Sequence, residues 1–227
     1  MRVRDQIAWL GFLVTLALFV APYRDVWGAT GIFARRNTAH LATGLPYVAS
    51  MFNSMLWLLY CGAHPSAYVP SMLLNTIGLL LNASYTACYM RYTSAVESRV
   101  CLRNVTIGAC VICAAMGWYS VEGVGGQAGV GKLAAMANIL MFYAPLASVS
   151  EVVRTQSVLK FPLPPLITGF CSALVWFLFG TYTLDWPVIV PNGLGIAFSV
   201  TQLSVYAYYA QCIGGQHIDA QAAIVEV

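Results

Sequence analysis

Six stretches of this 227-residue chain contain no aspartate, glutamate, lysine or arginine: 6–23, 37–90, 104–121, 133–150, 161–184 and 186–218. A helix needs about 20 mainly apolar residues to cross a bilayer. The stretch 37–90 is long enough for two such helices, separated by the turn-rich segment 61–70, and each of the others is long enough for one. The sequence therefore predicts an all-α membrane protein with seven transmembrane helices.

The composition excludes a soluble domain of this size. Hydrophobic residues make up 59% of the chain and charged residues only 8%, whereas an ordinary globular domain is about 25% charged. The net charge of +3 is too small and too dispersed to suggest a nucleic-acid partner. The lipid bilayer is therefore the first partner that the sequence predicts, and a homo-oligomer stays open.

The basic residues predict the orientation, because cytosolic loops are enriched in Lys and Arg. With seven spans, one side holds eight of them: Arg24, Arg35, Arg36, Arg91, Arg99, Arg103, Arg154 and Lys160. The other side holds three: Arg2, Arg4 and Lys132. We expect the N-terminus outside and the C-terminus in the cytosol, with the plasma membrane as the location.

The stretch "GGQAGVGKL" at 125–133 has the outline of a phosphate-binding loop, but its surroundings contradict that function. Such a loop follows a buried strand and carries Ser or Thr after its lysine, whereas here a predicted span precedes it and Leu133 follows Lys132. We interpret the stretch as a flexible connector. The pair Cys110 and Cys113 lies within a predicted span, so no redox or metal role is expected for it. The sequence offers no nucleophile–base arrangement, so neither an enzyme nor a cofactor is expected.

Uncommon residues mark an internal repeat. In the first half they are, in order, Pro22, Pro46, Trp57, Tyr60, Asn75 and Gly78. In the second half they are Pro145, Pro162, Trp176, Phe179, Asn192 and Gly195. Matching residues are separated by 123, 116, 119, 119, 117 and 117 positions, and this near-constant spacing indicates a duplicated three-helix unit.

The repeat explains an odd number of spans. Three spans end on the opposite side of the membrane, so a second copy in the same orientation needs one extra crossing. The predicted architecture is a 3+1+3 arrangement of two parallel triple-helix repeats: a first repeat at 1–92, a linker helix at 93–122 with its span at about 104–121, a second repeat at 123–210 and a short cytosolic tail at 211–227. Substrate sites of such proteins lie between the halves near mid-membrane.

Several stretches resemble the SWEET (MtN3/saliva) family of sugar transporters. They are "LFVAPY", "LPYVASMFNSMLWLLY" and "NTIG" in the first half, then "MFYAPLASVSEVVRTQSVLKFPLPPL", "VWFLFG" and "DWPVIVPNGLGIAFSVTQLSVY" in the second. The chain departs from the family pattern at "RRNTAH" in the first cytosolic loop and at Cys61, where glycine is usual. The resemblance implies a transporter of sugars across a membrane by alternating access, and not an enzyme.

The candidate substrate-binding residues are polar and aromatic. An asparagine amide offers both a hydrogen-bond acceptor and donors to sugar hydroxyls, and an indole offers a flat face to a sugar ring. The resemblance implies that Asn75 and Asn192 bind the sugar and that Trp57 and Trp176 line the pocket. Asn53 and Ser172 lie one helical turn before the two tryptophans and share their helix face. Interhelical packing is the alternative role for the asparagines, and interfacial anchoring for the tryptophans.

Two further groups of residues suit conformational change. Each proline lacks a backbone N–H and loosens its helix, and the resemblance implies that Pro22, Pro46, Pro145 and Pro162 are hinges around an inner gate. Tyr60 and Asp185 lie near the predicted outer face, where a phenol–carboxylate hydrogen bond would close a gate.

The predicted spans contain no ionisable residue that would couple transport to protons, so the sequence predicts passive uniport. Two bulky indoles facing each other predict monosaccharides such as glucose. Three alternatives stay open: a PQ-loop transporter of another small solute such as an amino acid, although the chain has no Pro-Gln dipeptide; a seven-span receptor; and a non-transporting scaffold.

Overall fold

The computed structural model describes residues 2–41, 43–63, 65–143, 146–156, 158 and 163–225. At 124, 147, 148 and 212–225 the structure describes the backbone only. The helices, in chain order, are α1 (Val3–Val20), α2 (Tyr23–Val26), α3 (Ile32–Arg35), α4 (Leu45–Gly62), the 3₁₀ turn η1 (Pro65–Ala67), α5 (Val69–Tyr92), α6 (Ala95–Glu122), α7 (Val124–Tyr143), α8 (Leu146–Thr155), α9 (Leu163–Thr183) and α10 (Trp186–Val225).

The described helices form an all-α membrane protein. By length and apolar composition, four segments of the described chain qualify as membrane spans: Val3–Val26, Ala95–Glu122, Leu163–Thr183 and Trp186–Gln211. Helices α4, α5 and α7 are not among these four segments. The arrangement of seven spans as 3+1+3 therefore remains a prediction.

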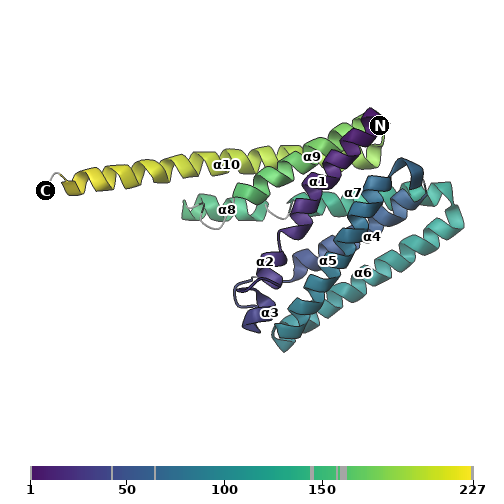
Figure 1. Cartoon of the computed structure of the whole chain (residues 1–227), viewed down its shortest axis with the longest axis horizontal. Coiled ribbons are helices and arrows are strands. Elements are labelled where there is room, and N and C mark those ends of the chain that lie inside the picture. Colours follow the sequence, from purple (N-terminus) through teal and green to yellow (C-terminus); the bar gives the residue numbers. More distant parts are fainter. Residues whose placement is uncertain are drawn as a thin grey trace.

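The long helices pack in two similar groups (Figure 1). In the first group α5 contacts both α1 and α4, and in the second α10 contacts both α7 and α9. Contacts between α1 and α9, and between α4 and α7, join the two groups. Helix α6 packs against α4, α5 and α7. The interface between the groups is therefore built by two helix pairs, and these pairs determine what lies between them.

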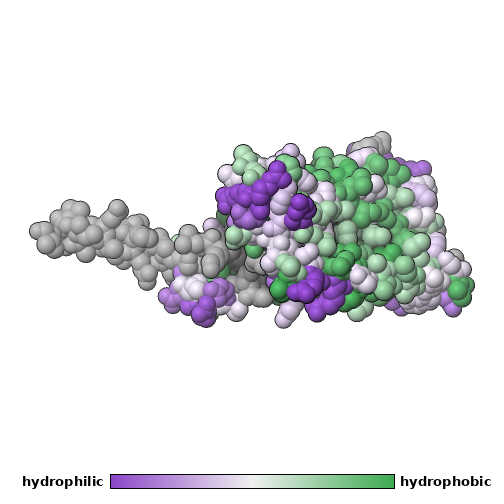
Figure 2. Space-filling model, turned by 90° about the horizontal axis from the view of Figure 1, so that it is seen from below, coloured by the Kyte–Doolittle hydropathy of each residue, from purple (hydrophilic) through white to green (hydrophobic). Residues whose placement is uncertain are grey.

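The outer surface is apolar over a broad area. Figure 2 shows a continuous hydrophobic region on one face, with hydrophilic residues gathered beside it. Leu13, Leu80 and Leu140 are each more than 60% exposed. A water-soluble protein rarely exposes such contiguous apolar surface, so this surface is suited to lipid.

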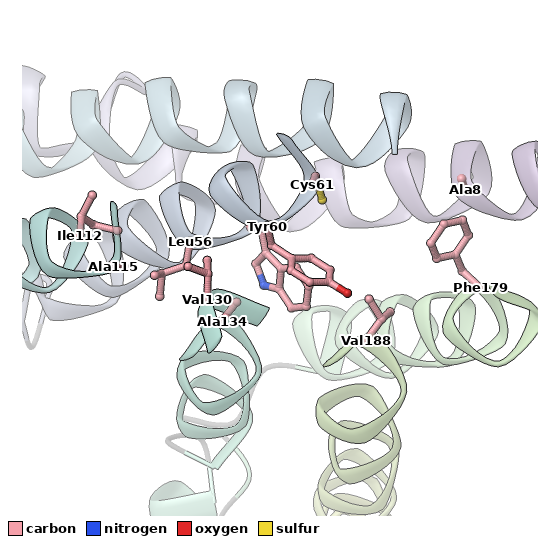
Figure 3. Close-up of a cluster of buried hydrophobic side chains, with 11 residues drawn as sticks. Ala8, Leu56, Tyr60, Cys61, Ile112, Ala115, Val130, Ala134, Phe179 and Val188 are labelled. Atoms are coloured by element: carbon pink, nitrogen blue, oxygen red, sulfur yellow. The ribbon is translucent and has the colours of Figure 1, made fainter. Parts of the chain in front are cut away.

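A buried cluster of apolar side chains holds the helix groups together (Figure 3). Its members come from α1, α4, α6, α7, α9 and α10: Ala8, Leu56, Trp57, Tyr60, Cys61, Ile112, Ala115, Val130, Ala134, Phe179 and Val188. Because one cluster draws on both groups, the end of the bundle that contains Tyr60 is closely packed.

The interpretation of residues 125–133 as a flexible connector is wrong. The stretch lies inside α7, and the turn before it is reduced to Gly123, whose φ is +55°. The glycines allow close helix packing: a methyl group at Gly129 would lie 2.4 Å from the Trp118 ring, and one at Gly131 would lie 2.6 Å from the Tyr60 ring. Packing against α6 and α4 therefore overrides the low helix propensity of glycine.

One helix boundary differs from the expected one. Helix α6 begins at Ala95, near the start of the helix expected at 93–122, because the Ser94 hydroxyl accepts a hydrogen bond from the Glu97 N–H at 3.2 Å and caps the helix. Helix α10 continues to Val225, past residue 210, where the second repeat was expected to end.

The first connecting segment, which departs from the family pattern, is tied to α5 by an arginine. Arg36 donates a hydrogen bond to the Tyr92 hydroxyl, and its guanidinium lies 4.7 Å from the centre of the Phe33 ring. Arg36 itself has a left-handed conformation with φ of 56° and ends α3. Arg36, the second arginine of "RRNTAH", therefore has a local structural role.

Candidate functional site

A cavity of about 340 Å³ lies between the two helix groups, within the size range of small-molecule sites, about 300–1,000 Å³. Its polar lining is Thr15, Ser50, Asn53, Ser71, Asn75, Asn138, Ser172 and Asn192, and its aromatic lining is Phe19, Trp57, Tyr68, Phe142 and Trp176. No described residue in this lining is charged. The cavity is therefore suited to an uncharged polar solute.

All six residues predicted to bind substrate line this one cavity: Asn53, Trp57, Asn75, Ser172, Trp176 and Asn192. They come from four different helices, α4, α5, α9 and α10. The structure thus brings together residues that are up to 139 positions apart in the sequence. Their binding of a sugar stays a prediction.

Asn75 and Asn192 have matching environments. The Asn75 side-chain N–H donates to the Ser71 carbonyl oxygen at 2.8 Å, and that of Asn192 donates to the Val188 carbonyl oxygen, also at 2.8 Å. Both side chains are buried, at 8% and 4% exposure. Each bond uses one of the two amide N–H groups and fixes the amide, so the second N–H and the carbonyl oxygen stay available to a ligand.

The two tryptophans also have matching neighbours. Trp57 meets the Tyr60 ring edge-to-face, with centroids 5.8 Å apart, and Trp176 meets the Phe179 ring edge-to-face at 5.5 Å. Phe179 follows Tyr60 by 119 positions, the separation of the tryptophans themselves. Aromatic packing of this kind fixes ring orientation. Each half therefore supplies one supported indole to the cavity.

Polar bridges cross the interface between the groups at two equivalent places. The hydroxyl groups of Thr15 and Ser172 are hydrogen-bonded at 2.7 Å, joining α1 to α9. The Asn53 side-chain N–H donates to Asn138 Oδ1 at 3.3 Å, joining α4 to α7. Asn53 Oδ1 is buried without a partner among the described residues. An orphaned buried acceptor in a polar cavity favours a ligand that donates a hydrogen bond.

Sequence reasoning missed Thr15 and Asn138, although a signal for them exists. They are 123 positions apart, the same separation as Pro22 and Pro145. Applying the repeat to every polar residue of the first span, and not only to uncommon residue types, would have identified this pair.

At one end of the cavity a buried carboxylate binds two phenols. Tyr60 donates to Asp185 Oδ1 at 2.8 Å, and Tyr68 donates to Asp185 Oδ2 at 2.6 Å. Asp185 is only 7% exposed, directly before α10, which excludes a merely solvated loop charge. Burial, and next the bond to Asp185, raise the pKa of the Tyr68 phenol above its usual value, so it stays protonated and able to donate.

Tyr68 was not predicted from the sequence. Its ring lies 6.0 Å from that of Tyr60 and 6.0 Å from that of Phe179, and Tyr68 also lines the cavity. This aromatic cluster lies at the end of the cavity near the turn between α4 and α5. Only a structure could show that Tyr68, eight positions beyond Tyr60, shares the same carboxylate.

Two phenyl rings of the cavity lining, those of Phe19 and Phe142, pack directly against glycines. A methyl group at Gly78 would lie 2.4 Å from the Phe19 ring, and one at Gly195 would lie 2.8 Å from the Phe142 ring. These contacts explain why both repeats carry glycine there, because any larger residue would displace the ring.

The predicted hinge prolines are only partly described. Pro22 precedes α2, and Pro46 lies in the first turn of α4, where a missing N–H leaves no helical bond unmade. The expectation that Pro46 removes a backbone bond from its span is therefore wrong. Pro145 and Pro162 lie outside the described residues. Pro191, inside α10, does interrupt the helix bonding, one residue before Asn192.

Lipid-exposed helices around an uncharged polar cavity, with a hydrogen-bonded aromatic cluster at one end, define a transporter of a small polar solute. The sequence matches the family described as "Sugar efflux transporter for intercellular exchange" (MtN3_slv) over residues 5–97 and 129–213. The chain belongs to this family of sugar transporters, which are not enzymes.

Individual relatives agree with this assignment. "Bidirectional sugar transporter SWEET7b" of Oryza sativa subsp. indica is 26% identical over 91% of this chain and 78% of its own length. "Bidirectional sugar transporter N3" of Medicago truncatula is 28% identical over 88% and 74%. A solved eukaryotic SWEET transporter superposes with a TM-score of 0.79 at 26% identity, covering 92% of this chain and 97% of that one. The comparisons favour neither the PQ-loop transporter nor the receptor.

Proposed function

We propose that this sugar transporter carries monosaccharides such as glucose passively, by alternating access of the central cavity to the two sides of the membrane. The observation that carries the proposal is the cavity itself, with its paired amides Asn75 and Asn192 and its paired indoles Trp57 and Trp176. An uncharged sugar exchanges its water hydrogen bonds for bonds to the amides and lays its apolar face on an indole.

The helix contacts support the 3+1+3 arrangement with α6 as the linker. The third helix of each group contacts the other two, and the groups meet through the matched pairs α1·α9 and α4·α7. This pattern is what a pseudo-twofold axis along the membrane normal would produce. On this proposal 1–92 and 123–210 are the two repeats, and rocking of one against the other exposes the cavity alternately.

Passive transport is expected because the described cavity lining contains no Asp, Glu, Lys or Arg. In cells that lack their own sugar transporters, glucose taken up through this protein should equilibrate and not accumulate, and a protonophore should leave the initial rate unchanged. Glucose uptake should exceed sucrose uptake because the two indoles limit the space. Accumulation above the external concentration would contradict uniport, and faster sucrose uptake would contradict the size argument.

The orientation follows from the basic residues on the side of the first connecting segment, including Arg35 and Arg36. A tag at the N-terminus should be labelled from outside intact cells, and a tag at the C-terminus only after permeabilisation. Plasma-membrane location should be read from the same cells, and crosslinking should show any homo-oligomer. External labelling of the C-terminal tag in intact cells would reverse the orientation.

A further inference from the structure

Helix α1 contacts the indole of Trp176 through a hydrogen bond and through close packing. The Trp176 Nε1–H donates to Thr15 Oγ1 at 2.9 Å, and the Thr15 hydroxyl is also bonded to that of Ser172 at 2.7 Å. A hydroxyl that accepts the indole proton can still donate its own proton. Thr15 therefore links the two cavity-lining side chains of α9 in one chain of hydrogen bonds.

Gly11, one turn before Thr15, completes this support. A methyl group at Gly11 would lie 2.9 Å from Trp176 Cε2 and 3.1 Å from Cζ2. The indole thus lies directly against the backbone of α1, with its N–H bound to Thr15. Because two independent contacts act on one ring, its position relative to α1 is tightly defined.

The equivalent tryptophan has a different environment. Adding the 123-position separation of the first helices places Ala134 where Gly11 stands and Asn138 where Thr15 stands. Asn138 accepts its hydrogen bond from Asn53 and not from an indole. Within the part of the chain that the structure describes, no residue accepts a hydrogen bond from the Trp57 N–H. The two cavity walls are therefore chemically unequal.

We propose that Thr15, together with Gly11, is a positioning residue that fixes the Trp176 indole as the rigid wall of the cavity and so sets the size of sugar it accepts. Among the described residues Trp57 has no such hydrogen bond to a neighbouring helix, so its N–H is free for a ligand. This inference rests on the proposed binding of sugar in the cavity. It assigns different roles to Trp57 and Trp176, which occupy equivalent positions in the two repeats.

The two support residues give opposite expectations. Thr15→Val keeps the shape but removes the acceptor, so the indole gains freedom and larger sugars fit better. Gly11→Ala pushes the ring into the cavity, so larger sugars fit worse. The measured quantity is the inhibition constant of sucrose against glucose uptake, divided by the glucose KM. Thr15→Val should lower this ratio about three- to tenfold, the effect of one hydrogen bond, and Gly11→Ala should raise it.

Conservative and control variants separate positioning from general stability. Thr15→Ser keeps the hydroxyl and should restore the wild-type ratio. Thr181→Val on the same helix as Trp176 removes an exposed hydroxyl that bonds only to its own helix at the Phe177 carbonyl, and it should leave the ratio unchanged. Glucose-dependent melting of the purified variants should show a weaker shift for Thr15→Val, even where membrane expression is low.

A ratio that stays at the wild-type value in Thr15→Val, or that moves in the same direction in both support variants, overturns the inference. Asn192→Ala serves as the reference for the underlying site. If Asn192→Ala loses glucose binding while Thr15→Val keeps the wild-type ratio, only the positioning role fails. If Asn192→Ala binds glucose normally, the proposed sugar site itself fails.

Discussion

Replacing Asn192 by alanine is expected to nearly abolish glucose transport while the protein still reaches the membrane, and Asn75→Ala should behave in the same way. Each variant leaves a buried sugar hydroxyl without its partner, at a cost of about 1–3 kcal/mol. This corresponds to about 5- to 140-fold in affinity, at tenfold per 1.4 kcal/mol. Uptake at low glucose, surface expression and glucose-dependent melting are the measurements.

Asn82→Ala is the matched control. Asn82 lies on the same helix as Asn75, is 3% exposed and donates an identical bond to the carbonyl oxygen four residues earlier, that of Gly78, at 2.8 Å. It is not among the residues that line the cavity. If the asparagines only join helices, all three variants should lose thermal stability alike, and glucose should still stabilise them. A glucose-dependent shift that survives in Asn192→Ala would exclude it from the site.

Removing one phenol from Asp185 is expected to open the aromatic end of the cavity. Tyr60→Phe or Tyr68→Phe takes away one of two bonds to a buried carboxylate. A hydrogen bond to a charged group contributes about 1.5–3 kcal/mol, so the ratio of closed to open states should fall tenfold or more. Because the cycle must close this end before the other opens, the maximal uptake rate should fall by a similar factor. Asp185→Asn should also slow uptake.

Cys61 offers a direct readout of this opening. Its side chain lines the cavity, directly follows Tyr60 in the chain and is only 2% exposed. A membrane-impermeant thiol reagent should label Cys61 faster in Tyr60→Phe than in the wild type, and a Cys61→Ala background identifies the label. Tyr182→Phe, at a 58% exposed tyrosine near the end of α9, should change nothing. Unaltered uptake in Tyr60→Phe, Tyr68→Phe and Asp185→Asn would show that the cluster is not a gate.

The contacts of Tyr60 also give a role to the glycine stretch that resembles a phosphate-binding loop. Gly131 leaves space for the Tyr60 ring, and the Gln127 side chain donates to the Tyr60 carbonyl oxygen at 3.4 Å. Helix α7 of the second group thus holds the residue of the first group that binds Asp185. The glycines Gly129 and Gly131 of "GGQAGVGK" are explained by packing against Trp118 and Tyr60 and not by binding of an anion.

The sequence by itself determined the class of this protein and the identity of its paired residues. Charge-free stretches of spanning length exclude a soluble fold. A chain of this length cannot shield so many apolar residues from water, and their exposure to water is unfavourable. The repeat is a property of residue order, so the equivalence of Asn75 with Asn192, and of Trp57 with Trp176, needs no structure. All four of these residues do line one cavity.

The tertiary structure alone decided which side chains meet. In a lipid-facing helix both faces are apolar, so hydropathy does not indicate the rotation of a helix about its axis. That rotation allows three side-chain hydrogen bonds between helices or their ends: Tyr68 with Asp185, Thr15 with Trp176 and Asn138 with Asn53. It also makes two equivalent tryptophans unequal, because Gly11 and Thr15 support one of them from α1 whereas Ala134 and Asn138 stand at the matching positions of α7. Contacts between helices, and not the pattern within any one helix, therefore define the walls of the cavity and the aromatic cluster at its end.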